Sequence, residues 1–119
     1  MGPKPRELVV RVSVGSDGLL RSASAEGHAG AEPAGRNLAC AGATVLLRTA
    51  YETLAQYPGV ELAGEAPSPG LLSFRVRRAA PETEGMVRGV GDFLLVGLSS
   101  LEREFPGAIR IINESERRL

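Results

Sequence analysis

Residues 8–26 read LVVRVSVGSDGLLRSASAE, and this stretch decides the fold. In residues 8–14 every second side chain is a large aliphatic one, and this period of two predicts a half-buried β-strand. Residues 15–18, Gly-Ser-Asp-Gly, favour a tight turn, so that residues 19–26 can return antiparallel to the first strand. The chain therefore begins with a predicted β-hairpin.

The pattern becomes helical after this hairpin. Between Leu38 and Gln56, apolar residues recur every three or four positions, which predicts an amphipathic helix. The apolar stripe consists of Ala43, Leu46, Leu47, Ala50 and Leu54. Asn37 is a suitable N-cap, and Pro58-Gly59 ends the helix. The small residues from Ala29 to Gly35 favour neither helix nor strand, so we predict a mobile loop between hairpin and helix.

The second half of the chain repeats this order of elements. Residues 60–66 and 71–78 predict a second hairpin, residues 81–105 a second helix opened by a proline, and residues 108–112 a last strand. The order ββαββαβ indicates an α+β fold with one sheet of about five strands, mostly antiparallel, packed with two helices. We expect a single domain over residues 1–119, with flexible tails at residues 1–6 and 113–119.

The second predicted helix is unusually rich in glycine. Its glycines are Gly85, Gly89, Gly91 and Gly97. Each is about 1 kcal/mol less favourable than alanine in a helix interior, so their number needs a reason. We expect close approach of the first helix, or of a second subunit, at these positions.

Composition excludes several classes of function. The 14 basic and 14 acidic residues cancel, which argues against direct nucleic-acid binding through net charge, so that any RNA contact would have to be local. A single cysteine, with no export signal and no membrane-spanning apolar run, indicates the cytoplasm. One histidine and one cysteine cannot form the ligand cluster of a zinc site, and no phosphate-binding loop motif occurs. We therefore expect no metal and no cofactor.

The chain's one histidine, His28, and one cysteine, Cys40, form the only complete set of catalytic groups. An imidazole beside a thiol can take its proton and leave a thiolate nucleophile. In the first turn of the predicted helix, the helix dipole would favour the thiolate, and the backbone N–H groups of Cys40 and Ala41 are candidates to bind an oxyanion. Taken singly, however, each residue is more often structural: a buried cysteine, a histidine in a loop.

Two short motifs carry a resemblance to a known family. Gly27-His28-Ala29, followed after a short loop by Cys40-Ala41-Gly42-Ala43-Thr44, resembles the ribosomal-processing cysteine proteases called Prp. The resemblance spans nearly the whole chain and agrees with that family's order of elements. It implies a homodimer whose Cys/His dyad removes an N-terminal extension from a precursor of the twenty-seventh protein of the large ribosomal subunit.

The resemblance also implies roles for individual residues. Cys40 attacks the scissile carbonyl, and His28 protonates the leaving amine and then activates the deacylating water. The intervening loop, with Ala29, Gly30, Pro33 and Gly35, is expected to gate the site. The family usually has Asp in place of Asn37 and Ser in place of Thr44. Thr retains a hydroxyl, and the Asn amide oxygen can still orient an imidazole.

Two functions of other classes stay open at this point. Arg75, Arg77 and Arg78, with Arg88, could make the chain a non-catalytic ribosome- or RNA-binding module through contacts to phosphates. The same arginines could merely keep an edge strand solvated. The second of these functions is a dimeric scaffold whose dyad is idle. The presence of Asn37, where the family usually has Asp, makes this possibility worth testing.

Overall fold

The computed structural model describes residues 7–27, 34–68 and 71–115 of the chain. The strands are β1 (Leu8–Val14), β2 (Leu20–Glu26), β3 (Val60–Ser68), β4 (Leu71–Ala79) and β5 (Ile109–Ser115), and the helices are α1 (Ala34–Ala55) and α2 (Glu84–Glu104), with a short 3₁₀ turn, Pro81–Thr83, before α2. The predicted order ββαββαβ is confirmed. Of the helices that these residues form, none has the length and hydropathy needed to cross a membrane.

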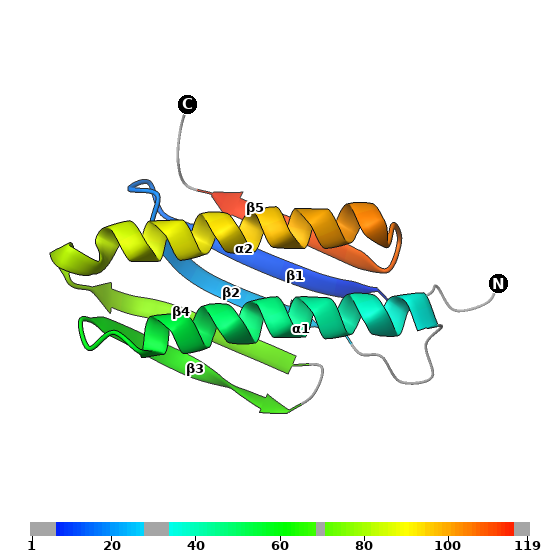
Figure 1. Ribbon diagram of the computed structural model, residues 1–119, viewed down its shortest axis with the longest axis horizontal. Helices are drawn as coiled ribbons and strands as arrows, with labels where there is room; N and C mark the ends of the chain where they lie inside the picture. The colour runs from blue at the N-terminus through cyan, green and yellow to red at the C-terminus, as the bar shows by residue number, and fades with distance from the viewer. Residues whose placement is uncertain (1–6, 28–33, 69–70, 116–119) are drawn as a thin grey trace.

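The strands form one mixed sheet in the order β3-β4-β2-β1-β5. Every neighbouring pair is antiparallel except β1 and β5, which run parallel, so the predicted mostly antiparallel sheet is confirmed. Figure 1 shows α1 and α2 lying side by side, in opposite directions, on one face of the sheet. No helix of the described residues lies on the other face (Figure 1), and the described fold therefore has two layers.

The core lies between the sheet and the helices. The aliphatic residues that alternate along β1 are all buried, as the period of two predicts: Leu8, Val10, Val12 and Val14. The buried stripe of α1 runs from Ala39 to Leu54, and α2 contributes Leu94 and Leu98. The rings of Tyr51 on α1 and Phe74 on β4 meet edge to face, with centroids 5.6 Å apart. These contacts hold α1 over the β4 side of the sheet.

The glycines of α2 divide into two groups. A Cβ added at Gly91 would lie 3.2 Å from the Leu20 Cβ, and one at Gly97 would lie 3.1 Å from Leu46. The expected close approach of the first helix is thus confirmed for Gly97, whereas Gly91 lets α2 pack tightly on strand β2 of the sheet, which we did not expect. Added Cβ atoms at Gly85 and Gly89 meet nothing within 4 Å, so no contact within the described fold explains them.

Strand β5 is longer than the sequence pattern indicates. We expected it to end at Ile112, but it continues to Ser115, because β1 offers partners as far as the pairing of Val14 with Ser115. Residues 113–115 therefore belong to the sheet and not to a tail. Parallel pairing depends on a strand distant in sequence, and a local pattern does not reveal it.

Asp17 holds the turn between β1 and β2. Its Oδ1 accepts a hydrogen bond from the Leu19 N–H at 3.0 Å, and its Oδ2 accepts one from the Arg21 guanidinium at 2.8 Å. The bond from Leu19, assisted by the charge of Arg21, lowers the pKa of Asp17 below its ordinary value of 3.8. The unfolded chain therefore binds this proton more readily than the folded chain does.

This shift predicts an acid-dependent loss of stability. Because the folded pKa is the lower one, the carboxylate stabilises the fold above the unfolded pKa, and that stabilisation is lost as the pH falls through the folded pKa. We expect Asp17→Ala to lower the free energy of unfolding at pH 7, and the difference from wild type to narrow below about pH 4 in urea titrations. Asp92→Ala, at an exposed carboxylate on α2, is the control. A difference that stays constant with pH would contradict the electrostatic explanation.

Candidate active site

Cys40 lies on α1, but deeper in the helix than expected. The helix begins at Ala34 and not near Leu38, so Cys40 occupies the second turn, and Asn37 lies inside the helix and is not its N-cap. The residues after Pro33 explain the longer helix: Ala, Arg and Leu are strong helix formers, and no β-branched residue intervenes before Cys40. The prediction of a helix start at Leu38 was wrong for this reason.

The new helix start changes the expected electrostatics at Cys40. Only the first four N–H groups of a helix lack partners within it, and in α1 these belong to residues 34–37. The N–H groups of Cys40 and Ala41 fall beyond this set, so the prediction that they are available to an oxyanion was wrong. The dipole effect also fades after the first turn, which weakens its support for a thiolate.

Cys40 and Thr44 share one flank of α1. Both are half-buried, and their separation by four residues places them one above the other on the helix. Tyr51 lies on the same flank two turns farther on, and its ring contacts Phe74 of β4. This flank therefore faces the β4 side of the sheet, away from α2, and Cys40 packs against the edge of the hydrophobic core. The hydroxyl expected one turn after the cysteine is present as Thr44.

Gly27 ends β2 in a conformation that favours glycine. Its φ is +117°, and an added Cβ would lie 2.8 Å from the carbonyl oxygen of Glu7 and 3.2 Å from the Cα of Leu8. Both contacts are with main-chain atoms of the segment that leads into β1, which cannot easily move aside. A side chain is therefore excluded at the position directly before His28 in the sequence.

The ends of β2 and α1 lie at the same end of the molecule. Figure 1 shows β2 finishing, and α1 starting, at the end where the C-terminal part of α2 also lies. A Cβ added at Gly42 of α1 would lie 2.9 Å from Leu101 of α2, which agrees with this arrangement. The structure thus brings the two segments that carry the predicted dyad to one end of the two-layer fold.

Several other predicted site residues lie either outside the described part of the chain or in a different element than expected. His28, Ala29, Gly30 and Pro33 lie outside the described residues. Gly35, which we expected in the loop, belongs to the first turn of α1, because the helix starts at Ala34. Within the described part of the chain, no three acidic, histidine or cysteine side chains gather as a metal site would require.

The family model of the cysteine protease Prp matches residues 9–110, from the first strand to the last. This chain belongs to the Prp family. It is a cysteine protease, and the resemblance seen in the Gly27-His28 and Cys40-Ala41 motifs is confirmed at the level of the family. No curated protein matches the chain.

Several solved structures share the fold, among them two of a Prp protease. The essential ribosomal processing protease Prp from S. aureus, in complex with a substrate peptide, superposes with a TM-score of 0.73 at 18% identity, covering 90% of this chain and 99% of that one. Its complex with a covalently linked product peptide gives 0.69, with the same identity and coverage. SMU.848 from Streptococcus mutans gives 0.73 at 18% identity, covering 92% of this chain and 96% of that one.

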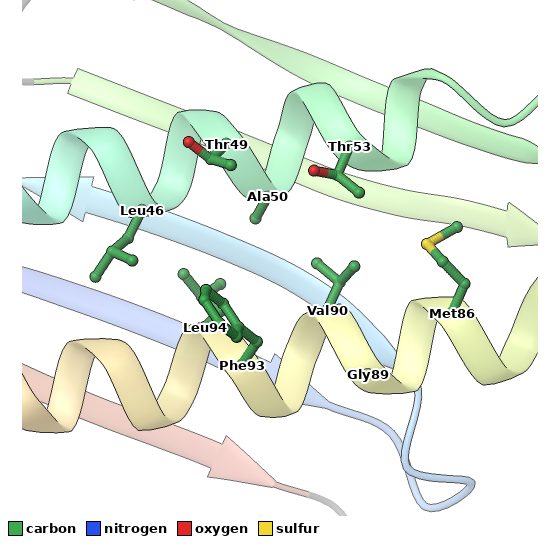
Figure 2. Close-up of a pocket in the computed structure, with 9 residues that line it drawn as sticks. All are labelled: Leu46, Thr49, Ala50, Thr53, Met86, Gly89, Val90, Phe93 and Leu94. Carbon is green, nitrogen blue, oxygen red and sulfur yellow. The ribbon is translucent and has the colours of Figure 1, made fainter.

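This Prp family member also has an apolar groove that the sequence did not reveal. It lies between α1 and α2, has a volume of about 460 Å³, and is lined by Leu46, Thr49, Ala50, Thr53, Met86, Gly89, Val90, Phe93 and Leu94. Figure 2 shows side chains from the two helices that point into the space between them: Leu46, Ala50, Met86, Val90 and Leu94. One signal in the sequence is Phe93, a large apolar residue that lines the groove, but its exposure of 72% follows only from the packing.

Proposed function

We propose that this protein is an endopeptidase that removes an N-terminal extension from a ribosomal protein precursor, using Cys40 as nucleophile and His28 as general acid and base. The observation that carries this proposal is the position of Cys40 near the start of α1, at the end of the fold where β2 finishes at Glu26, in a chain that the Prp family model matches. His28 directly follows Gly27 in the sequence, so the chain tethers it to that end.

The proposed reaction is acyl transfer. The Cys40 thiolate attacks the scissile carbonyl carbon, and the new C–S bond forms as the carbonyl π electrons move to oxygen. His28, protonated by the thiol, donates that proton to the leaving amine as the C–N bond breaks. It then takes a proton from water, which attacks the thioester and releases Cys40. Asn37 and Thr44 are proposed to support the dyad, and Ala29, Gly30 and Pro33 to gate it.

The proposed substrate is the precursor of the twenty-seventh protein of the large ribosomal subunit. Two findings support a ribosomal substrate: the family match, and the fold shared with the S. aureus ribosomal processing protease, which has been solved with substrate and product peptides. The cytoplasm is the compartment we propose, since a reducing environment keeps Cys40 usable as a thiolate.

Incubation with the organism's own full-length ribosomal protein tests this function. We expect one N-terminal cut, read from the product masses, by the wild type and none by Cys40→Ala. A cut at several sites, or an equal cut by both proteins, would contradict the proposal. The absence of any cut would exclude this precursor as the substrate and would leave the protease family assignment standing.

We propose further that the enzyme is a homodimer joined through its helix layer. Four of the large hydrophobic side chains exposed on the described residues lie on the two helices: Leu38, Val45, Phe93 and Val96. Two helices of this length side by side have a flat outer surface of roughly 600 Å², and protruding side chains add to it. This area is close to the roughly 800 Å² that each subunit buries in a standard interface. The open space beside Gly85 and Gly89 leaves room for close approach of a second copy.

The homodimer predicts a strong effect of charge at Phe93. Phe93 protrudes beside the α1/α2 groove, and a two-fold axis would let each ring enter the groove of the other subunit. We expect Phe93→Glu to raise the dimer dissociation constant at least about 100-fold, measured by analytical ultracentrifugation. Asn113→Glu introduces the same charge at an exposed position of β5 and serves as the control. A wild type that is monomeric at micromolar concentration, or a Phe93→Glu protein that still dimerises, would contradict the proposal.

A further inference from the structure

The open face of the sheet carries a group of arginines on β4. Arg75, Arg77 and Arg78 are all exposed, and among the side chains that the structure describes, which leave out residues 65–72, none forms an ion pair with them. β4 is paired on both sides, with β3 and with β2, so the interpretation that these arginines solvate an edge strand is wrong. Three exposed cations on an interior strand need a different explanation.

A β-bulge explains how two consecutive arginines reach the same face. Glu61 of β3 pairs with Arg78 and Leu62 pairs with Val76, so Arg77 is the extra residue of β4. At such a bulge two residues oppose one on the partner strand, and the side chains are re-aimed. Arg77 and Arg78 are both exposed, whereas Val76 is buried, as this geometry requires. Glu61 is thus the only acidic residue directly opposite the two arginines in the register.

A second bulge adds a cation at the same end of the sheet. Ser13 pairs with Ser22 and Val14 with Leu20, which leaves Arg21 as the extra residue of β2. Ser22 pairs in turn with Arg75, so Arg21 lies beside the β4 arginines. Its charge is shared with Asp17 through their 2.8 Å ion pair. The arginines of β4 therefore carry the excess positive charge here.

Small polar side chains form the surface beside these arginines. A shallow hollow of about 330 Å³ is lined by Ser22, Ala23, Ser24, Ala63, Gly64, Ser73, Phe74 and Arg75. In the register Ser24 lies opposite Ser73, and Ser22 lies opposite Arg75, so hydroxyls and guanidinium are neighbours. The large hydrophobic side chains exposed on the described residues lie instead on the helices and, in Tyr57, just after α1.

This chemistry matches the phosphate backbone of a nucleic acid. Arginine and serine side chains are common donors to phosphate oxygens, whereas a protein partner usually needs exposed apolar side chains at its centre, and the exposed large hydrophobic residues of the described chain lie elsewhere. No exposed aromatic ring is available here for stacking on bases, which favours contacts independent of sequence. We propose that the open face of the sheet, through Arg75, Arg77 and Arg78, binds the phosphate backbone of RNA. This contact is local, which is compatible with the balanced net charge.

Arg88 does not belong to this surface. It lies on α2, on the helix side of the sheet, and its guanidinium donates to the carbonyl oxygen of Asp17 at 3.2 Å. The grouping of Arg88 with the β4 arginines, made from sequence, was wrong because α2 covers the opposite face (Figure 1). The RNA surface and the proposed dimer surface are therefore on different sides of the molecule, and each can be tested without the other.

Fluorescence anisotropy with a labelled 20-nucleotide RNA of mixed sequence tests the proposal. If about three phosphates are contacted, the dissociation constant of the wild type should rise roughly tenfold to twentyfold between 50 and 200 mM salt. We expect Arg77→Gln with Arg78→Gln to weaken binding and to lower the salt slope by more than 1. The control carries Arg48→Gln with Arg103→Gln, the same loss of charge on the helices, and should keep the wild-type slope.

The outcomes separate the proposal from its alternatives. Equal weakening in both double variants would show a response to net charge alone and would overturn it. Absence of wild-type binding at 50 mM salt would overturn it as well. If polyglutamate displaces the labelled RNA as efficiently as unlabelled RNA of equal charge does, the partner of this face would be an acidic protein instead. Thermal unfolding of each variant shows whether it still folds. If the double variant does not fold, RNA binding by the single variant Arg75→Gln is measured in the same way: weaker binding than the wild type supports the proposal, and unchanged binding overturns it.

Discussion

Replacement of Cys40 by alanine is expected to abolish peptide cleavage while leaving the fold intact. Removal of the nucleophile from a hydrolase dyad or triad lowers the rate by about 10⁴-fold or more. The structural effect should be small, because Cys40 is only half-buried and its neighbours Ala39 and Ala43 fill the core side of the helix. Arg48→Ala, at an exposed position of the same helix, should cleave at the wild-type rate.

Alkylation separates the chemical role of His28 from a structural one. Cys40 is the chain's single cysteine, so iodoacetamide labels one site, which can be followed by mass. If His28 takes the thiol proton, the wild type should react as a thiolate near neutral pH, and His28→Ala should require a more alkaline solution for the same rate. Identical pH profiles for the two proteins would show that His28 does not activate Cys40.

Gly27→Ala should have the largest effect on stability. The new side chain would occupy a left-handed φ and would press on main-chain atoms of residues 7 and 8, and such strain amounts to about 1–3 kcal/mol. The free energy of unfolding, measured in urea, should fall accordingly. We also expect slower cleavage by the folded variant, because the displaced end of β2 carries His28 with it.

Gly107→Ala is the matched control for this substitution. Gly107 also has a positive φ, of 85°, but an added Cβ would meet nothing within 4 Å. We therefore expect a smaller loss of stability and no change in the cleavage rate. Equal losses in the two variants would show that φ alone, and not the clash with the start of β1, determines the cost. A folded Gly27→Ala that cleaves normally would break the proposed link between β2 and the dyad.

The regular elements were predictable because their patterns are local. The alternation in β1 and the stripe from Ala43 to Leu54 each follow from the side chains of one segment, and the packing later buried both as expected. The start of α1 was missed because small residues before Cys40 suit a loop as well as a helix. Turn chemistry and helix propensity gave opposite indications there, and the tertiary context decided.

The features that could not be predicted depend on residues distant in sequence. The bulges that aim Arg21 and Arg77 exist only because of the register between paired strands. The groove requires that Phe93 and Leu46, on different helices, meet across an antiparallel pair. For the candidate site, the sequence motif indicated Cys40 as the candidate nucleophile, but only the fold shows that Cys40 lies in the second turn of α1.

The two-layer architecture has a consequence for valency. A single sheet separates the apolar helix layer from the arginine-bearing face, so a partner that covers one side leaves the other exposed. Two copies joined through their helices would turn both arginine faces outward, away from each other. Such a dimer would be bivalent, and a single long RNA, or two RNA segments held close together, would be retained more tightly than one short strand.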